Sequence, residues 1–331
     1  MLTSPLSKTL DKPSPPLVWV VDSAYTGEIN ARIGLAIRLG YPYEIIPMPN
    51  GDSYGYEQKL KERYNCSTQN KNTRLLIISG TGEETTAEIA DLKMHFEESL
   101  LNIYLASILP DKLHPRLCEY DLIASPQLTG ANIITLIGVP HNLTADTLGC
   151  AYQLHESYFS SLAKPVIGLL IGGNTRYCDG FDEQHAAKLA KRISSIAKSL
   201  GGTLVISNSR RTPESAMAVL LDNLQGLNYC FFDWQQIEKS FYHAMLAHAD
   251  IFIVTGDSLS MCSEAAFTGK PLLVDLSPNA TECYHREIVG KLIDYGAAKH
   301  LTDRFEPWTY QPLDSTESIA REIRNWLQKS G

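Results

Sequence analysis

Residues 249–276 read ADIFIVTGDSLSMCSEAAFTGKPLLVDL, and this stretch predicts one complete strand–helix–strand unit. An apolar strand at 251–254 leads into a polar turn at 255–258, and the helix that follows ends at Gly269. A second apolar strand occupies 272–276. In open α/β sheets, ligands bind where a strand ends and the next helix begins, and the N–H groups exposed there suit anions.

The same alternation of short apolar runs and helical patterns extends over the rest of the chain, and it is typical of mostly parallel sheets. The predicted strands are 17–22, 43–48, 74–79, 103–108, 121–125, 133–139, 166–171, 203–207 and 229–232, followed by the two quoted above. The predicted helices are 28–39, 85–96, 144–162, 182–200, 213–224, 240–248 and 258–268, with closing helices at 284–295 and 316–329.

A chain of 331 residues exceeds one ordinary core, and each half shows the same α/β layout. The predicted fold class is therefore α/β, with two Rossmann-like doubly wound domains facing each other across a cleft. Residues 1–15 are expected to form a disordered polar tail, 16–150 the first domain, 151–163 a linker helix, and 164–331 the second domain with the closing helices.

Composition and charge argue against several classes of function. Hydrophobic residues make up 44% and charged residues 20%, which argues against wholesale disorder. The formal net charge is −8 and no long basic run is present, so nucleic acid is not an expected partner. The seven cysteines are scattered without a CxxC pair, which argues against a disulfide framework and a zinc site. With no membrane-spanning run and no signal core, we expect a cytoplasmic protein, with peripheral membrane attachment left open.

Two polar turns of the second half are candidate ligand-binding segments. The turn Gly172-Gly173-Asn174-Thr175-Arg176 follows strand 166–171, and its glycines allow backbone N–H groups to approach a ligand closely. Ser209-Arg210-Arg211 precedes a helix start, where arginines suit a phosphate or a carboxylate. Each turn also has a plain structural interpretation, as a tight turn or as a surface pair that bridges to acidic neighbours.

The third turn is Thr255-Gly256-Asp257-Ser258, and the helix after it carries Ser260 and Glu264 on one face because they are four residues apart. A carboxylate in that position can accept hydrogen bonds from two adjacent hydroxyls, as on a ribose. The structural alternatives are that Glu264 only complements the helix dipole and that Asp257 only caps the helix.

These motifs together resemble a known family. IGGN at 171–174, SNSRRTP at 207–213, and VTGDSLSMCSEA with TGKP within 254–271 resemble the mitochondrial-fission "elongated mitochondria" family, whose bacterial members are often labelled nucleoside-diphosphate-sugar epimerases. The resemblance implies the GT-B architecture, in which a nucleotide-sugar lies between two Rossmann-like domains. It makes 16–150 the acceptor-side domain and 164–331 the nucleotide-binding domain.

The resemblance also implies a set of ligand-binding residues. Gly172 and Gly173 would approach the diphosphate, Arg210 and Arg211 would be its charge partners, and Glu264 would bind the ribose. The full set that it implies is Gly172, Gly173, Asn174, Ser209, Arg210, Arg211, Thr255, Gly256, Asp257, Ser258, Ser260 and Glu264.

An inverting transferase needs a general base that faces the sugar from the first domain. The candidates are Glu28, which stands where the family usually has histidine, and His141; Asp22 and His114 lie at other strand ends. No DxD metal motif is present, so we expect no metal and no cofactor, with a helix dipole and arginine stabilising the departing diphosphate.

Three functions remain open from the sequence. The leading one is a metal-independent glycosyltransferase, whose partners are a small-molecule nucleotide-sugar and an unknown acceptor that can lie at a membrane surface. The alternatives are a nucleoside-diphosphate-sugar epimerase and a noncatalytic adaptor of the mitochondrial-fission family that retains the fold.

Overall fold

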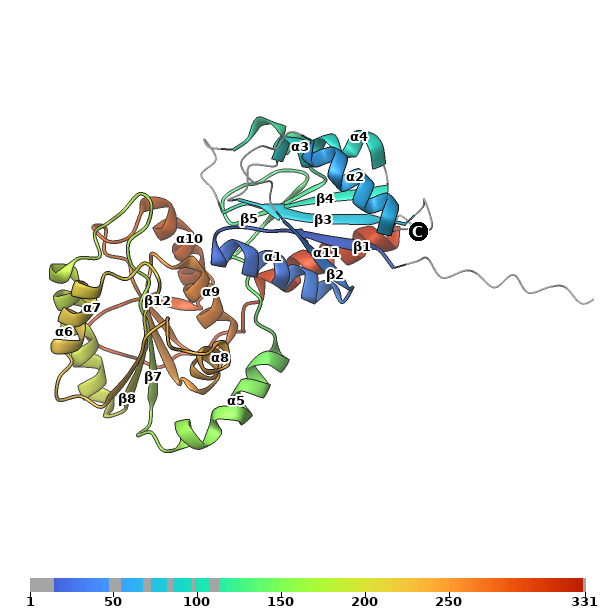
Figure 1. Ribbon diagram of the computed structural model, residues 1–331. Helices are drawn as coiled ribbons and strands as arrows, with labels where there is room; N and C mark the ends of the chain where they lie inside the picture. Colours follow the sequence, from blue (N-terminus) through green and yellow to red (C-terminus); the bar gives the residue numbers. More distant parts are fainter. Residues whose placement is uncertain are drawn as a thin grey trace, which may run out of the picture.

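Two parallel six-stranded sheets, each with helices on both faces, build the protein (Figure 1). The structure is a computed structural model that describes residues 15–47, 55–67, 73–81, 86–96, 99–107 and 113–329. Residues 1–14 of the predicted tail lie outside the described residues. The expected α/β class and the two doubly wound domains are confirmed.

The first sheet has the strand order β2-β1-β3-β4-β5-β6, and every neighbouring pair is parallel. Its elements are β1 (Leu17–Val21), α1 (Thr26–Leu39), β2 (Tyr43–Ile46), α2 (Tyr56–Ser67), β3 (Leu75–Gly80), α3 (Thr86–Asp91), α4 (Lys93–Phe96), β4 (Leu100–Leu105), a 3-10 helix (Pro115–Glu119), β5 (Leu122–Ser125) and β6 (Ile133–Thr135). The strand order reverses between β1 and β3. That reversal is the point at which open α/β sheets bind ligands.

The second sheet has the order β12-β11-β10-β7-β8-β9, again all parallel, and its order reverses between β7 and β10. Its elements are α5 (Ala145–Ser160), β7 (Val166–Leu170), α6 (Glu183–Leu200), β8 (Thr203–Ser207), α7 (Glu214–Asp222), β9 (Tyr229–Phe232), α8 (Lys239–His248), β10 (Ile251–Thr255), α9 (Leu259–Phe267), β11 (Leu272–Asp275), α10 (Cys283–Asp294) and β12 (Ala298–His300). Counted from β7, this is the Rossmann order 3-2-1-4-5-6.

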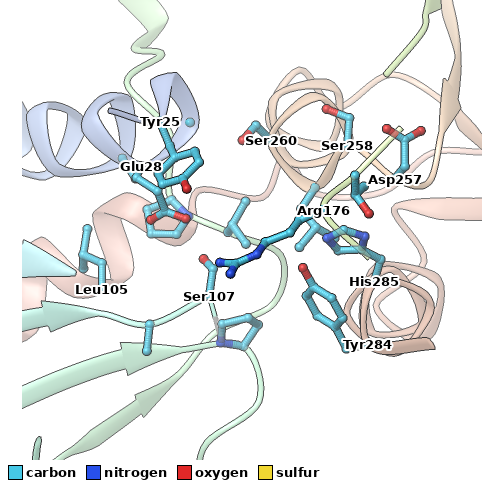
Figure 2. Close-up of a pocket in the computed structure, with 18 of the residues that line it drawn as sticks. Tyr25, Glu28, Leu105, Ser107, Arg176, Asp257, Ser258, Ser260, Tyr284 and His285 are labelled. Atoms are coloured by element: carbon cyan, nitrogen blue, oxygen red, sulfur yellow. The ribbon is translucent and has the colours of Figure 1, made fainter. Parts of the chain in front are cut away.

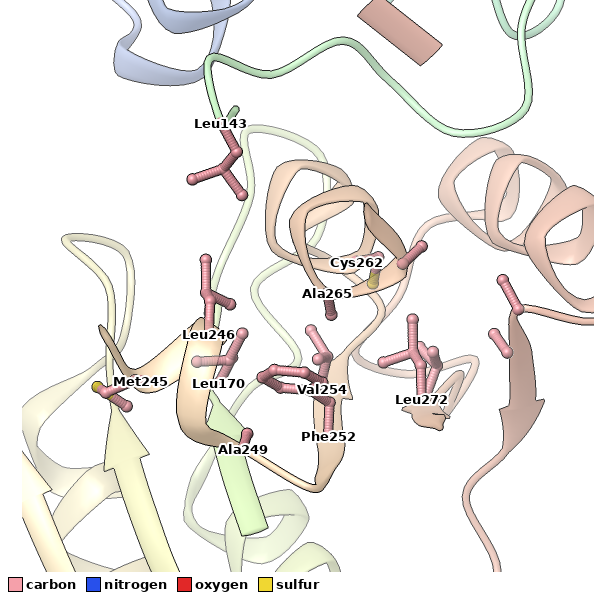
Figure 3. Close-up of a cluster of buried hydrophobic side chains, with 14 of the residues drawn as sticks. Leu143, Leu170, Met245, Leu246, Ala249, Phe252, Val254, Cys262, Ala265 and Leu272 are labelled. Atoms are coloured by element: carbon pink, nitrogen blue, oxygen red, sulfur yellow. The ribbon is translucent and has the colours of Figure 1, made fainter. Parts of the chain in front are cut away.

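Each sheet is buried on both faces, which explains why its strands are continuous apolar runs. In the second domain, α6 and α7 cover one face, and α5, α8, α9 and α10 cover the other. Figure 3 shows part of this second core, where Leu170, Phe252 and Val254 of the strands meet Leu246 and Ala265 of the helices.

The predicted linker helix at 151–163 is part of α5, and α5 is more than a linker. It packs along α8 and contributes Ala151 and Phe159 to the core of the second domain. The ring of Phe159 stacks on His248 with 4.5 Å between the centroids. The linker assignment therefore differs from the structure because the apolar residues of this helix find a partner in α8.

The last helix, α11 (Ser315–Lys329), belongs to the first domain, although the sequence assigned it to the second as a closing helix. Ile319, Ala320 and Ile323 are fully buried against the face of the first sheet that α1 also covers. Figure 1 shows α11 lying beside α1. The first domain is therefore completed by the end of the chain.

Two segments connect the domains and are bonded to each other. The backbone N–H of His141 donates to Thr316 Oγ1, and that hydroxyl donates to the carbonyl of His141, each at 2.9 Å. The predicted strand 133–139 ends early, at Thr135, because Gly138 has a left-handed conformation (φ 73°) that turns the chain toward the second domain. There the N–H of Val139 donates to Ser263 Oγ of α9 at 2.9 Å.

Replacing Ile319 with valine is expected to loosen the first domain rather than the second. Removing one buried methylene costs about 0.5–1.5 kcal/mol. We expect faster amide hydrogen exchange in β1 and β3, with β7 and β8 unchanged, because the side chain of Ile319 packs only in the first core. The matched variant Ile196→Val, in the second core, should give the opposite pattern. Faster exchange in β7 for Ile319→Val would contradict the assignment of α11.

Candidate functional site

A cavity of about 290 Å³ lies between the two domains, at the carboxyl ends of strands from both sheets (Figure 2). From the first domain it is lined by the loop between β1 and α1 and by the residues that follow β4 and β5. From the second domain it is lined by the loops after β7, β8 and β10 and by the start of α10. The cavity therefore meets the reversal point of each sheet, which makes it the candidate site.

Three helices begin at this cavity: α1, α9 and α10. None of the three has a side-chain hydrogen bond at its N-cap. Gly27 of α1 lies so close to α9 that a Cβ atom on it would stand 3.0 Å from Ser260 Oγ. A helix start carries about half a positive elementary charge and unsatisfied N–H groups, so this convergence favours an anion.

Asp257 is buried and forms an ion pair with the half-buried Arg211, and this pair joins three loops of the second domain. Arg211 Nη2 lies 2.9 Å from Asp257 Oδ2, and the backbone N–H of Gly173 donates to the same oxygen at 2.7 Å. Arg211 Nη1 also donates to the carbonyl of Asn174 at 2.9 Å. Burial raises the pKa of Asp257 above its ordinary value, while Arg211 acts in the opposite direction. Both residues line the cavity.

The glycines of the first turn do not present their N–H groups to the cavity. The N–H of Gly172 donates to Thr255 Oγ1 at 2.7 Å, and that of Gly173 donates to Asp257. A Cβ atom on Gly172 would collide with the Asp257 carboxylate, and one on Gly173 with the backbone of Arg211. Glycine is therefore required by the approach of protein groups, and this structure does not offer either N–H to a diphosphate.

Several other predicted ligand-binding residues hold these loops in place without lining the cavity. Asn174 Oδ1 accepts from the N–H of Phe181 at 3.0 Å, and Ser209 Oγ donates to the carbonyl of Gly172. Gly256 leaves no space for a Cβ atom beside Leu276. Thr255 is buried, and Arg210 is exposed to solvent. Ser258 and Ser260, in contrast, do line the cavity, at the start of α9.

Arg176 is a cavity residue that sequence reasoning missed. It stands in the loop between β7 and α6, and Figure 2 shows its guanidinium reaching across the cavity toward the side of Glu28 and Ser107. Neighbouring Thr175 donates a hydrogen bond to Glu282, at the start of α10. The available signal was a basic residue two positions after Asn174, within the turn already under consideration.

The structure separates the two candidate bases. Glu28 lies in the first turn of α1 and lines the cavity, with its carboxyl group pointing into it in Figure 2. His141 lies in the connection between the domains, where it is 2% exposed and its ring packs 4.9 Å from that of Phe267. Burial lowers the pKa of His141 to about 4. Its side chain does not reach the cavity, which leaves Glu28 as the candidate base.

Glu264 also lies outside the cavity lining, in the second turn of α9. Its carboxylate accepts a hydrogen bond from the Tyr242 hydroxyl at 2.7 Å, and Tyr242 belongs to α8. Burial raises the pKa of Glu264 to about 7, and the Tyr242 hydrogen bond only partly opposes this. A role in binding ribose stays a prediction, because this structure directs the carboxylate toward α8.

Glu264 should make the free energy of unfolding fall as the pH rises. Its pKa is raised from 4.5 to about 7 by folding, so the folded state holds the proton more tightly. The resulting stability is present below pH 4.5 and is lost by about pH 7. The loss is on the order of 3 kcal/mol. Denaturant unfolding at pH 5 and pH 8 should show this loss in the wild type and not in Glu264→Gln.

Glu287→Gln is the matched control for this pH dependence, because Glu287 is an exposed glutamate of the same domain. It should retain the wild-type dependence on pH. The same dependence in Glu264→Gln as in the wild type would show that another group is responsible.

Tyr284 and His285, in the first turn of α10, are further cavity residues that the sequence did not single out. Burial is the main cause that raises the pKa of Tyr284 well above its ordinary value. The two rings are neighbours, with centroids 4.1 Å apart. No local motif marks either residue, since a lone histidine early in a helix is most often structural.

Within the described ranges, no group of three or more His, Cys, Asp or Glu side chains is placed to hold a metal ion. Across the same residues, none of the helices combines the length and the apolar character that crossing a bilayer requires.

Comparison with known proteins identifies the family. The model of the family "Mitochondrial fission ELM1" matches residues 26–327. The Mitochondrial fission protein ELM1 of Arabidopsis thaliana is 31% identical over 327 residues, covering 86% of this chain and 73% of the relative. The uncharacterized protein RP120 of Rickettsia prowazekii is 26% identical over 348 residues, covering 93% of this chain and 97% of the relative.

Solved structures show the fold. The UDP-GlcNAc 2-epimerase of Methanocaldococcus jannaschii superposes with a TM-score of 0.60 at 12% identity, over 93% of this chain and 99% of its own. A glycosyltransferase of Rickettsia africae superposes with a TM-score of 0.52 at 13% identity, over 96% of this chain and 89% of its own. At such identities the likeness concerns the fold, which is GT-B-like. The match over residues 26–327 and the plant relative show that this chain belongs to the mitochondrial fission ELM1 family.

Proposed function

We propose that the protein binds a nucleoside-diphosphate sugar in the interdomain cavity and transfers the sugar to an acceptor without a metal ion. The observation that carries this proposal is the convergence of the starts of α9 and α10 with the Arg176 guanidinium in one cavity, which Arg211 also lines. Uncapped helix starts and guanidinium groups are donors that suit a diphosphate. Their position at the reversal points of two facing sheets suits a ligand held between domains.

In the proposed reaction, Glu28 takes the proton of the acceptor hydroxyl as its oxygen bonds to the anomeric carbon of the sugar. The bond from that carbon to the diphosphate breaks, and its electron pair stays on the phosphate oxygen. Positive groups fixed before the reaction stabilise this developing charge. The start of α10 lies across the cavity from Glu28, and the side chain of Arg176 reaches between the two.

The acceptor side of the cavity is mainly apolar. Leu105 is the last residue of β4 and Ala106 follows it, and Ala124 and Pro126 lie at the end of β5. Such a wall favours an acceptor whose hydroxyl is carried by an apolar body, which includes molecules presented at a membrane surface.

A thermal-shift screen tests the proposed binding and names the nucleotide. The ligands are UDP, GDP, CMP and their common sugar conjugates. A ligand present at 100 times its dissociation constant stabilises the folded state by about 2.7 kcal/mol, which raises the melting temperature measurably. We expect a selective shift with one base. An unchanged melting temperature with every ligand at millimolar concentration would contradict the proposal.

Epimerisation is the first alternative, and it makes different demands on the lining. The carboxylates among the described lining residues are those of Glu28 and Asp257, and Asp257 is bound to Arg211. A 2-epimerase needs acid and base groups on the sugar itself, and besides Glu28 the described lining offers Tyr284 and His285 for such roles. Incubating the protein with the donor and no acceptor separates the two, because only an epimerase converts the sugar.

A noncatalytic adaptor is the second alternative, and the name of the Arabidopsis relative, a mitochondrial fission protein, favours it. An adaptor can retain the nucleotide site as a structural or regulatory pocket. It would show the thermal shift without either transfer or epimerisation, and Glu28→Gln would leave its partner binding unchanged.

A further inference from the structure

His285 lines the cavity, and its imidazole makes no hydrogen bond with the described part of the chain. The residue is 6% exposed, and its Nδ1 atom is buried without a partner. Figure 2 shows the ring at the cavity wall, near Tyr284 and Asp257. The described protein groups leave the hydrogen-bonding capacity of this ring unused, so a ligand in the cavity can supply it with a partner.

The groups around His285 determine its charge. Arg176, Arg211 and Asp257 face it from the loops after β7, β8 and β10, Glu28 faces it from the first domain, and Tyr284 precedes it in α10. Burial is the main cause that lowers the pKa of His285 to about 4, and Arg211 adds to this effect. The ring is therefore neutral at neutral pH in this structure, with one donor and one acceptor nitrogen.

An anion beside the imidazole of His285 raises its pKa, because it favours the protonated form of the ring. A negative charge within about 4–6 Å favours the charged form of a histidine, and a diphosphate carries two such charges. Arg211, which adds to the effect of burial on the pKa of His285, is also one of the positive groups that would attract a diphosphate into the cavity. We propose that His285 contacts the diphosphate of the bound ligand and takes up a proton when that ligand binds. This inference rests on the proposed function.

Proton uptake by His285 places a positive charge beside the diphosphate, in addition to the charge of Arg176. As the bond between the sugar and the diphosphate breaks, the electron pair remains on a phosphate oxygen, and the protonated ring donates a hydrogen bond to the diphosphate. The proton of the acceptor goes to Glu28, so the two groups act on opposite sides of the sugar. On release of the diphosphate, His285 returns its proton to solvent.

Calorimetric titration with UDP-glucose and GDP-mannose tests the proposal, because the diphosphates of these probes do not themselves titrate near neutral pH. Each titration is repeated at pH 6.5 in buffers with different enthalpies of ionisation. The dependence of the binding enthalpy on the buffer then gives the number of protons taken up. We expect a substantial fraction of one proton in the wild type, and tighter binding at pH 6 than at pH 8.

His285→Gln should still bind the probe, more weakly, with no proton uptake and no dependence of affinity on pH. His300→Gln, at an exposed histidine of the same domain, should behave as the wild type. Binding by the wild type without proton uptake, or equal uptake in His285→Gln, would overturn the inference and leave the proposed function standing. Absence of binding to any nucleotide in the thermal-shift screen would overturn both.

Discussion

Replacing Asp257 with alanine is expected to lower the free energy of unfolding by about 2–3 kcal/mol, because it removes the buried acceptor of a backbone N–H group and of a partly exposed arginine. The carboxylate is 2% exposed and accepts from both Arg211 and the N–H of Gly173. Alanine leaves that N–H without its acceptor and Arg211 without its counter-charge. Urea denaturation of both proteins measures the difference.

Asp257→Asn is the matched control for this substitution. Its amide oxygen can still accept from Gly173, and its size is unchanged, so we expect a clearly smaller loss of stability than for alanine. Stability in Asp257→Ala within about 1 kcal/mol of the wild type would show that the loops after β7, β8 and β10 do not depend on the pair.

Replacing Glu28 with glutamine is expected to slow turnover of the nucleotide-sugar by about 10²–10⁴-fold, the usual contribution of a general base. Glutamine has nearly the same shape and cannot take the acceptor proton. Because Glu28 is the proposed base for the acceptor and belongs to the first domain, affinity for the nucleotide should change little. Transfer of sugar from the donor identified by the screen, measured at saturating donor, reports this loss as a lower kcat.

Asp22→Asn serves as the control for Glu28→Gln. Asp22 lies in the loop between β1 and α1, a few residues before Glu28, and its side chain accepts from the N–H of Ser23 and does not line the cavity. It should retain wild-type turnover. If Glu28→Gln also retains full turnover, Glu28 is not the base.

The strands of both sheets could be predicted because each is a short apolar run bounded by polar or glycine-containing turns. Strands 203–207 and 229–232 have the bounds predicted for them. The pattern of apolar runs gave wrong strand bounds where contacts with distant parts of the chain decide the backbone conformation. Residues 136–139 are apolar enough to extend β6, but the left-handed Gly138 directs them to the second domain. The short β12 was missed because it pairs with β11 through only three residues.

The partner of a helix is not encoded in its own periodicity. The apolar stripe of α11 predicts a helix with one buried face, and that stripe would suit either sheet equally well. α11 lies on the first sheet because the chain runs back from the second domain to the first just before it, where Thr316 is bonded to the backbone of His141. For the same reason, no local pattern distinguished a linker from the packed helix α5.

The candidate site was only partly predictable, since a turn motif does not say where each side chain points. Of two consecutive arginines, Arg211 is bonded within the loops and Arg210 faces solvent, whereas Arg176 reaches into the cavity. His285 lacks any motif and acquires its place through the packing of α10 against the loops. The sequence did predict that ligand-binding residues lie at the carboxyl ends of the strands, where the cavity is found, because ligand sites follow strand ends in such sheets.

The most direct test of the central claim is to titrate the nucleotide diphosphate identified by the screen into wild type, Arg176→Ala and Arg210→Ala. A hydrogen bond to a charged group contributes about 1.5–3 kcal/mol, or about 10–150-fold in the dissociation constant. The cavity model predicts that loss for Arg176→Ala, and a dissociation constant within about twofold of wild type for Arg210→Ala. Equal affinity in all three proteins would contradict a diphosphate site in this cavity.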